Sequence, residues 1–294
     1  MHLNEYQERA KSTDQQPLGE GMDPNSSEML VPLLGMVGEL GELLAEYKKW
    51  LRDGQAYALF PDRAREELGD LLWYLSNTAT KFGLSLEEIG RYNLQKTARR
   101  WPAKETKASH RKLFDEEYPP EERLPRKMGV TINEGGSKVV KMFIDGKQVG
   151  DDLRDNRYDD DGYRFHDVFH LTYASVLGWS PILRALLRRK RKSNPAVDEV
   201  EDGGRARVIE EGIAAMVFSY AERRNFLEGA EGVSFELLRT IKDMTAHLEV
   251  SCRAEGEWER AIMEGFRIWR QVRDSGEGKI EADLERGTIT LTPR

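Results

Sequence analysis

The sequence predicts a mainly α-helical protein in which a small β element separates two helical parts. Apolar residues recur at spacings of three and four over long stretches of both halves, which is the pattern of one helical face. Between residues 102 and 161 this pattern gives way to prolines, turn glycines and short strand-like runs. The length of 294 residues corresponds to about two domains of ordinary size. Together these observations favour two helical domains joined by a connector.

The first half begins with a short helix, expected from residue 3 to about residue 14. A stretch rich in Gly, Pro and Asn at 16–27 then interrupts the helical pattern. A longer helix is expected over 28–52, where the apolar residues keep the three-and-four spacing, and Asp53-Gly54 ends it.

Two more helices are expected before residue 100. The first begins at Pro61 and runs to about residue 82, where Gly83 suits a left-handed C-cap. Ser85 and Glu88 form the Ser-x-x-Glu pattern of a capping box for the second, which reaches residue 98 or 99.

The rest of the chain is expected to form a connector and a second helical domain. The runs at 128–136 and 138–150 look like short strands with turn glycines. Helical periodicity returns after residue 162, and a β tail at 279–292 follows the last helix. We therefore expect a helical domain over 1–103, a connector with short strands over 104–161 and a second helical domain over 162–294.

The second half is similar in pattern to the first. GELGELLAEY at 38–47 aligns with HDVFHLTYAS at 166–175, and EELGDLLWYL at 66–75 aligns with EEGIAAMVFS at 210–219, with the apolar positions in register. Two-helix patterns of this kind also match by chance, so the second half is either a divergent copy of the first or a helical domain of its own.

Composition and charge exclude several classes of protein. The formal net charge of -7 argues against stable nucleic-acid binding, because a polyphosphate backbone needs a net basic surface. The basic run at 188–192 is followed closely by the acidic run at 197–202, so we expect a solvated loop whose charges compensate each other. The single cysteine, Cys252, excludes an internal disulfide and fits a reducing compartment. With neither a signal peptide nor a membrane-length apolar run, we expect a cytoplasmic protein without membrane contact.

Four acids in the first half have the spacing of a metal site. Glu39 and Glu42 lie three residues apart on one expected helix, and Glu67 and Asp70 repeat this spacing on the next. If the two helices face each other, the four carboxylates gather in one region and repel one another unless a cation is bound. Magnesium prefers oxygen ligands and bridges to phosphates, which indicates metal-assisted attack on a phosphoanhydride. For either pair alone, the alternative is a solvated helix face.

Residues around the acids strengthen this interpretation. Asn93, Lys96 and Arg99 on the helix over 85–99 offer donors and positive charge to phosphate oxygens, although basic residues are also favoured at a helix C-terminus by the helix dipole. Glycine inside a helix costs about 1 kcal/mol relative to alanine, so three glycines beside the acids suggest close helix approach there: Gly38, Gly41 and Gly69.

Three runs of the first half resemble the successive motifs of one protein family. They are GELGELLAEYKKWL at 38–51, EELGDLLWYLSNTATKFGLSLEEI at 66–89 and NLQKTARRWP at 93–102. In this order they are similar to the motifs of the MazG-like nucleoside triphosphate pyrophosphohydrolases. The resemblance covers about residues 28–102.

The resemblance implies an all-α helical bundle that hydrolyses nucleoside triphosphates, NTPs or dNTPs, to the monophosphate and pyrophosphate. It implies bound Mg²⁺, with Mn²⁺ as an alternative, and a homo-oligomer, either a dimer or a tetramer. On this chain the metal ligands that it implies are Glu39, Glu42, Glu67 and Asp70. The phosphate-side positions are Asn93 and Lys96, with Lys49 and Arg52 as further candidates.

Two other functions stay open at this point. The same acids suit hydrolysis of a related phosphoanhydride, such as a phosphoribosyl nucleotide. A non-catalytic nucleotide-sensing module is the other alternative. The complete set of four acids argues against the sensing module, because a pure binder does not need to gather so much negative charge.

The second half carries a different candidate metal site. Imidazole ligands favour manganese, iron, nickel or zinc over magnesium. Ala214 stands where a repeat would need an acid, which speaks against a magnesium site of the first type. The alternative is a histidine pair that is partly buried in a helical bundle. The residues of this second site are His166, Asp167 and His170 on one expected helix and the paired acids Glu210 and Glu211 on another, of which Glu211 is the expected ligand.

Overall fold

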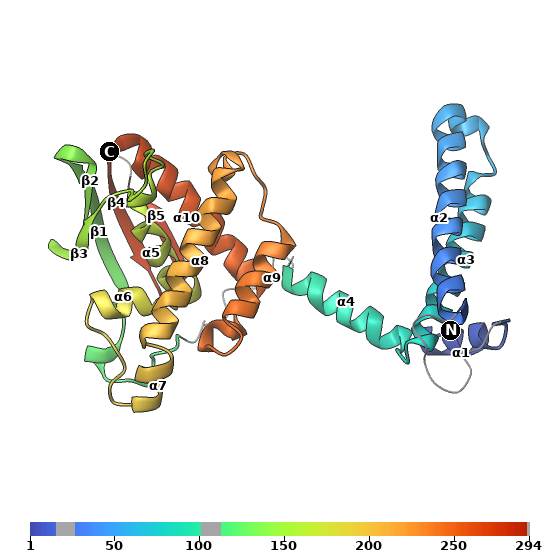
Figure 1. Cartoon of the computed structure of the whole chain (residues 1–294), viewed down its shortest axis with the longest axis horizontal. Helices are drawn as coiled ribbons and strands as arrows, with labels where there is room; N and C mark the ends of the chain where they lie inside the picture. The colour runs from blue at the N-terminus through green and yellow to red at the C-terminus, as the bar shows by residue number, and fades with distance from the viewer. Residues whose placement is uncertain (16–26, 101–112, 293–294) are drawn as a thin grey trace. The chain divides into compact units, whose positions relative to one another are not determined.

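The computed structural model describes residues 1–15, 27–100 and 113–292 of the chain. The contacts divide the chain into two compact units, Met1–Ala98 and Arg99–Arg294. Both units are mainly helical, and the sheet found among the described residues belongs to the second unit (Figure 1). The predicted fold class, mainly α with a small β element, is confirmed at this level. Within the described ranges, no helix combines the length and the apolar character that crossing a membrane requires.

The first unit is built on a hairpin of two long helices. Helices α2 (Ser27–Asp53) and α3 (Phe60–Lys81) run side by side and are joined through a short 3₁₀ helix at Gly54–Ala56. Helix α1 (Leu3–Lys11) packs on α3, and α4 (Leu86–Arg100) follows α3 in the chain. The helices expected from the apolar spacing are therefore present.

The turn between α3 and α4 is held by α1. Gly83 has a φ of +67°, the left-handed conformation that its position after α3 predicted. The buried Gln7 of α1 donates from Nε2 to the Leu84 carbonyl at 2.8 Å and to the Thr80 hydroxyl at 3.1 Å. Its Oε1 accepts from the Leu86 backbone N–H at 2.8 Å. These bonds fix the end of α3 and the start of α4.

The second unit contains a five-stranded antiparallel sheet with the strand order β3-β2-β1-β4-β5. The central strand β1 pairs on both sides, with Val130 opposite Ile144 of β2 and Ile280 of β4. The strands come from two distant parts of the sequence: β1 (Lys127–Gly135), β2 (Val139–Ile144) and β3 (Lys147–Leu153), then β4 (Glu277–Asp283) and β5 (Thr288–Leu291).

The segment expected to be a connector is thus part of the second unit. Alternate residues of a strand face the same side, and Met128, Val130 and Ile132 of β1 are all buried. The boundary expected at 161–162 has no counterpart in the contacts, which hold 99–294 together. The sequence pattern shows that strands form, but it does not show that β1 pairs with a strand at the far end of the chain.

Helices cover the sheet of the second unit. Helices α5 (Asp167–Leu177) and α10 (Glu255–Ser275) contact each other and also β4 and β5, while α8 (Gly204–Glu222) packs on α5. Every residue of α5 is buried. The remaining described helices are α6 (Pro181–Leu186), α7 (Pro195–Val200), α9 (Phe235–Met244) and the 3₁₀ segments Pro120–Glu122, Gly136–Lys138, Tyr163–Phe165, Asn225–Leu227 and Glu249–Cys252.

Aromatic side chains fill the core of the second unit. Phe169 of α5 and Phe266 of α10 pack with their ring centroids 4.7 Å apart, and both are buried. Trp269 is fully buried, and its indole Nε1 donates to the Gly162 carbonyl at 3.0 Å. This bond joins α10 to the turn that leads into α5.

The structure does not confirm that the second unit repeats the first. Helix α2 has 27 residues, carries many exposed side chains and pairs directly with α3. Its aligned counterpart α5 has 11 residues, is buried throughout and is separated from α8 by α6 and α7. The shared apolar spacing therefore reflects helix formation in both places and not a common arrangement.

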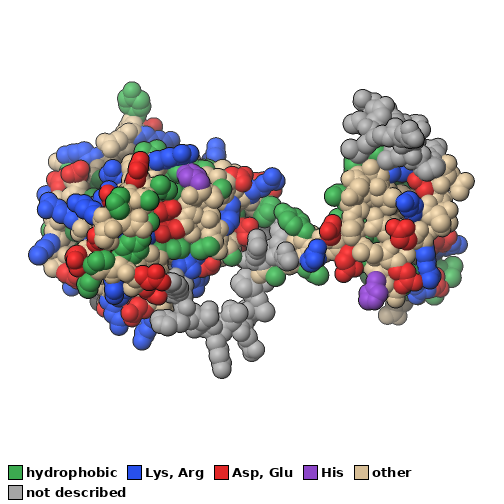
Figure 2. Space-filling model, turned by 90° about the horizontal axis from the view of Figure 1, so that it is seen from below, with side chains coloured by type: hydrophobic (Ala, Val, Ile, Leu, Met, Phe, Trp, Pro, Cys, Tyr) green, Lys and Arg blue, Asp and Glu red, His purple; other side chains and the backbone are tan. Residues whose placement is uncertain are grey.

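The basic run at 188–192 is not the solvated loop that we expected. Arg191 is only 1% exposed, and its guanidinium lies 2.7 Å from carboxylate oxygens of both Asp202 and Glu249. Lys190 pairs with Asp198 at 2.6 Å. The charges compensate each other as predicted, but a buried guanidinium requires paired acids. Asp202, between α7 and α8, and Glu249, in the 3₁₀ segment Glu249–Cys252, supply them for Arg191. On the face drawn in Figure 2, acidic and basic side chains are interspersed over this unit.

Candidate functional site

The first candidate site lies on the hairpin of α2 and α3. Carboxylate oxygens of Glu39, Glu67 and Asp70 lie within 4.8 Å of one another. Glu42 is exposed one turn further along α2, and its negative charge acts on Glu67. The structure therefore brings three of the predicted acids together and places the fourth beside them.

Repulsion between carboxylates characterises this acid cluster of Glu39, Glu67 and Asp70. The pKa of Glu67 is raised, first by partial loss of solvent, then by the negative charge of Glu39 and the hydrogen bond between the two side chains. The pKa of Tyr6 on α1 is also raised, by burial and then by the charge of Asp70. A divalent cation among these oxygens would replace repulsion with attraction.

The glycines beside the acids do not mark a close helix contact. A Cβ added to Gly38, Gly41 or Gly69 would meet no atom within 4 Å among the described residues. The close approach occurs at Gly35, where a Cβ would lie 2.3 Å from the ring of Tyr74. The expectation was wrong because a small residue is needed only where a large side chain crosses the helix. The acid cluster borders open space within its unit.

The structure describes the surroundings of only some of the predicted phosphate-binding residues. Lys49 donates to Oε1 of Glu46 at 2.5 Å, and the hydroxyl of Tyr57 donates to the other oxygen of this carboxylate. The hydrogen bond from Lys49 is the main reason that the pKa of Glu46 is lowered. Asn93 is exposed on α4. The side chains of Lys96 and Arg99 lie outside the described residues.

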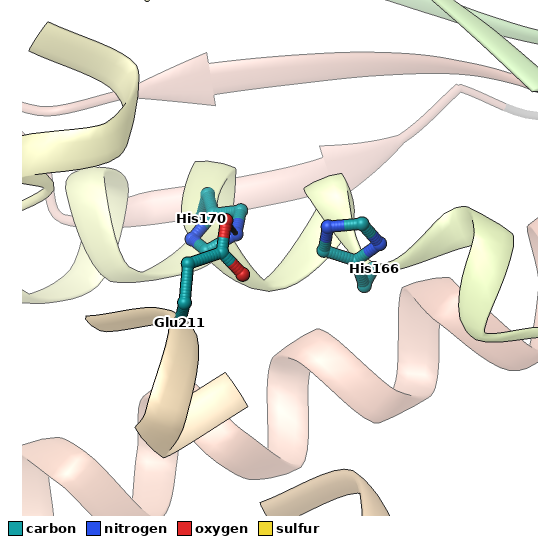
Figure 3. Close-up of side chains that lie close together, drawn as sticks. All are labelled: His166, His170 and Glu211. Atoms are coloured by element: carbon teal, nitrogen blue, oxygen red, sulfur yellow. Dashed lines mark ion pairs between the residues drawn. The ribbon is translucent and has the colours of Figure 1, made fainter. Parts of the chain in front are cut away.

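The second candidate site lies where α5 meets α8 in the second unit. Single ligand atoms of His166, His170 and Glu211 lie within 4.8 Å of one another, and Figure 3 shows the three side chains together. The remaining predicted member, Asp167, has its Oδ1 4.0 Å from Nε2 of His166 and does not belong to this group of three. The structure therefore joins three of the four predicted residues.

His170 is clamped between two consecutive glutamates of α8. Its Nδ1 lies 2.9 Å from Oε1 of Glu210, and its Nε2 lies 3.6 Å from Oε1 of Glu211. Burial alone lowers the pKa of His170, but Glu210 and then Glu211 outweigh this effect and raise the pKa to about 10.

Glu210 precedes the predicted ligand Glu211 and contacts the other nitrogen of His170. It is fully buried, and its carboxylate accepts from the Ser180 hydroxyl at 2.7 Å and from the Ile182 backbone N–H at 2.8 Å. These donors come from the N-terminus of α6, so the carboxylate is fixed on three sides together with His170. The sequence pairs these acids at 210–211, and the structure places one near each ring nitrogen of His170.

His166 is positioned by the turn before α5. Its Nδ1 lies 2.9 Å from the Tyr163 carbonyl, and its ring stacks on the Tyr163 ring with centroids 4.5 Å apart and an interplanar angle of 5°. The pKa of His166 is lowered, mainly by burial. The two histidine rings stand nearly perpendicular, with centroids 5.6 Å apart.

Comparison with known proteins places the second unit in a family. The MazG C-terminal domain family matches residues 109–294. The chain is also 33% identical over 98 residues to the gene 37 protein of Mycobacterium phage L5, an alignment that covers 33% of this chain and 85% of that protein. No solved structure matches. The family match includes the second candidate site, while the acid cluster of α2 and α3 lies before it.

Proposed function

This chain belongs to the MazG C-terminal domain family, and from this premise we propose that it is a metal-dependent nucleotide pyrophosphohydrolase. The proposed reaction is hydrolysis of an NTP or a dNTP to the nucleoside monophosphate and pyrophosphate. The observation that carries the proposal is the gathering of Glu39, Glu67 and Asp70 on two facing helices.

The acid cluster fits a magnesium ion. All of its ligand atoms are carboxylate oxygens, which hard divalent cations prefer, and Glu42 stands one turn away as a further ligand or a base for water. The raised pKa of Glu67 supports the assignment, because a bound cation would stabilise the ionised form that the neighbouring acids now disfavour. Mn²⁺ is the alternative ion, since it also accepts oxygen ligands.

In the proposed reaction, the oxygen of a water molecule forms a bond to a phosphorus atom of the triphosphate chain, and the bond from that phosphorus to the leaving pyrophosphate oxygen breaks. An ion held by Glu39, Glu67 and Asp70 would supply positive charge to the water and to the phosphate oxygens. Glu42 accepts a proton from the attacking water. Lys49, Asn93, Lys96 and Arg99 are the proposed donors to phosphate oxygens.

We also propose that the first unit self-associates. Along α2 an apolar stripe with spacings of three and four residues is exposed, and its centre at Val37 is 68% exposed. A helix gains most of its stability by burying such a stripe, so this face requires a partner. A second copy offers an identical stripe, as in the symmetric pairing of a homodimer. The stripe consists of Leu30, Leu34, Val37, Leu40, Leu44, Tyr47 and Leu51.

The proposed activity is tested by product analysis with a panel of NTPs, dNTPs and phosphoribosyl nucleotides, with and without magnesium. We expect magnesium-dependent release of monophosphate and pyrophosphate that Glu67→Gln abolishes. Glu87→Gln is the matched control, because Glu87 is an exposed glutamate of the same unit on α4. Turnover of phosphoribosyl nucleotides alone would move the assignment to that substrate. Magnesium-dependent nucleotide binding without turnover would indicate a sensing module.

A further inference from the structure

The second unit carries a polar cluster that the proposed hydrolysis does not use. We propose that His166, His170 and Glu211 bind a divalent transition-metal ion, through Nε2 of each histidine and the carboxylate of the glutamate. The three ligand atoms lie within 4.8 Å of one another at the contact of α5 and α8 (Figure 3).

The strongest single observation is a buried nitrogen that makes no hydrogen bond. His170 is 1% exposed, and within the described part of the chain its Nε2 has no hydrogen-bond partner. Oε1 of Glu211 lies 3.6 Å away, which is beyond hydrogen-bond distance. Buried polar atoms normally make hydrogen bonds, so a buried nitrogen that makes none and points toward a second histidine and a carboxylate indicates a missing ligand.

Both rings are held in the tautomer that metal binding needs. The Tyr163 carbonyl can only accept a hydrogen bond, so Nδ1 of His166 donates to it. Nδ1 of His170 donates in the same way to the carboxylate of Glu210. With the proton on Nδ1, each neutral ring keeps the lone pair of Nε2 for a metal ion. A carboxylate behind a ligating histidine is a recurrent arrangement in metal sites, and Glu210 is here a positioning residue.

The protein preorganises the two histidines and leaves the carboxylate exposed. The side chain of His166 is 13% exposed and that of His170 is 2% exposed, whereas the side chain of Glu211 is 44% exposed. In a tetrahedral zinc site with bonds of about 2.0 to 2.1 Å, neighbouring ligand atoms lie about 3.4 Å apart. The exposed Glu211 can close the remaining gap, and solvent reaches the ion from its side.

The donor set decides the class of ion. Two imidazole nitrogens and one carboxylate select Zn²⁺, Fe²⁺, Mn²⁺, Co²⁺ or Ni²⁺ over Mg²⁺, which prefers oxygen ligands. Three protein ligands leave at least one coordination position for water, as in catalytic and not in structural zinc sites. The two sites of the chain therefore differ in the ions that they select.

The competing explanation is structural. A protonated His170 paired with Glu210 and Glu211 would also satisfy the charges of this contact without any metal. The two explanations differ in one measurable property, because only the metal site retains an ion when magnesium is present in excess.

The test uses the full chain, stripped of metal and titrated with Zn²⁺ in the presence of millimolar Mg²⁺, which occupies oxygen-only sites. We expect one tightly bound Zn²⁺ per chain in calorimetry and in elemental analysis. Co²⁺ in place of Zn²⁺ should give the absorption bands of a nitrogen-ligated ion. Glu211→Gln and His166→Gln should each remove this binding.

Controls keep the result interpretable. Glu222→Gln is the matched control, because Glu222 lies on the same helix, is part-exposed and pairs with Arg157 instead of the cluster. It should bind Zn²⁺ as the unmodified chain does. Glu210→Gln should weaken binding by about 10- to 100-fold, the usual effect of removing a carboxylate behind a ligating histidine. Thermal melting of each variant confirms that it is folded. No Zn²⁺ retained under excess Mg²⁺, or Zn²⁺ retained equally by Glu211→Gln and His166→Gln, would overturn the proposal.

Discussion

The two units of this chain show opposite ways of arranging charged side chains. The acid cluster on α2 and α3 consists of oxygen ligands on a helical hairpin whose neighbouring surface is open. The cluster on α5 and α8 combines nitrogen and oxygen ligands, and its central residue, His170, is almost completely buried. The hairpin leaves its apolar stripe exposed, whereas the second unit encloses a full aromatic core.

This difference shows how many contacts from the rest of the fold an acid cluster near the surface and a buried histidine cluster each require. A carboxylate near the surface keeps part of its hydration and needs only a neighbouring helix to come within reach of its partners. A buried imidazole needs a fixed acceptor on one nitrogen, and Glu210 meets this need only because α6 supplies it with two donors. The buried site therefore depends on elements from several parts of the fold.

The largest expected effect concerns the core that supports the second unit. Trp269→Ala should lower the free energy of unfolding of this unit by about 3 to 5 kcal/mol, because it removes a large buried side chain and leaves a cavity. Chemical denaturation measures the effect. Val208→Ala on α8 is the control, since Val208 is 72% exposed and should change stability by no more than about 0.5 kcal/mol. Equal effects of the two substitutions would contradict the described core.

A crossed pair of substitutions tests whether the two sites are independent. Glu39→Gln should lower kcat for nucleotide hydrolysis by on the order of 100-fold, the scale for losing a group that stabilises transition-state charge, and should leave Zn²⁺ binding unchanged. Glu211→Gln should remove Zn²⁺ binding and leave kcat for nucleotide hydrolysis unchanged. Steady-state kinetics and calorimetry on the same preparations give both readouts. Loss of hydrolysis in both variants would show that the two clusters act together.

The exposed apolar stripe of α2 is the reason that we expect the first unit, and not the second, to need a partner. Val37→Lys places a charge at the centre of the stripe and should weaken self-association by about 10- to 100-fold, which corresponds to about 1.4 to 2.8 kcal/mol. Sedimentation measured over a range of concentrations checks this. Val208→Lys, an equally exposed site on α8, should leave association unchanged. A monomeric unmodified chain would exclude a second copy as the partner of this stripe.

The smallest expected effect is on stability, and it should have opposite signs at two glycines of α2. Gly38→Ala should raise the stability of the first unit by up to about 1 kcal/mol, because helix-interior glycine is unfavourable and a Cβ meets open space there. Gly35→Ala should lower the stability, because its Cβ would collide with the ring of Tyr74. Thermal melting of the two variants is the measurement. A stabilising Gly35→Ala would mean that Tyr74 moves aside readily.

Local sequence patterns predicted the elements of the fold better than their partners. The glycine at Gly83 and the Ser85 cap gave the end of α3 and the start of α4, because both act through the backbone of adjacent residues. The strands of the presumed connector were also expected. Their pairing with the C-terminal strands was not, because β pairing depends on contacts between residues that are far apart in the sequence.

The candidate sites show the same limit. The spacing of Glu39 and Glu42 with that of Glu67 and Asp70 predicted an acid cluster, and the structure places three of these acids within reach of one another. Spacing did not show that Asp167 stays outside the histidine group. Which of two neighbouring residues faces a ligand depends on how the helix is rotated against its neighbours.

The sequence by itself determined the helices, the two acid pairs and the presence of two histidines one turn apart, because these follow from periodicity and spacing within single segments. The tertiary structure decided that the connector strands belong to the second unit, that Arg191 is buried among acids and that Glu210 holds His170. It also decided that the apolar stripe of α2 does not face α3. The physical reason is that an apolar or charged pattern specifies that a face needs a partner, whereas the identity of the partner depends on which distant segments pack together.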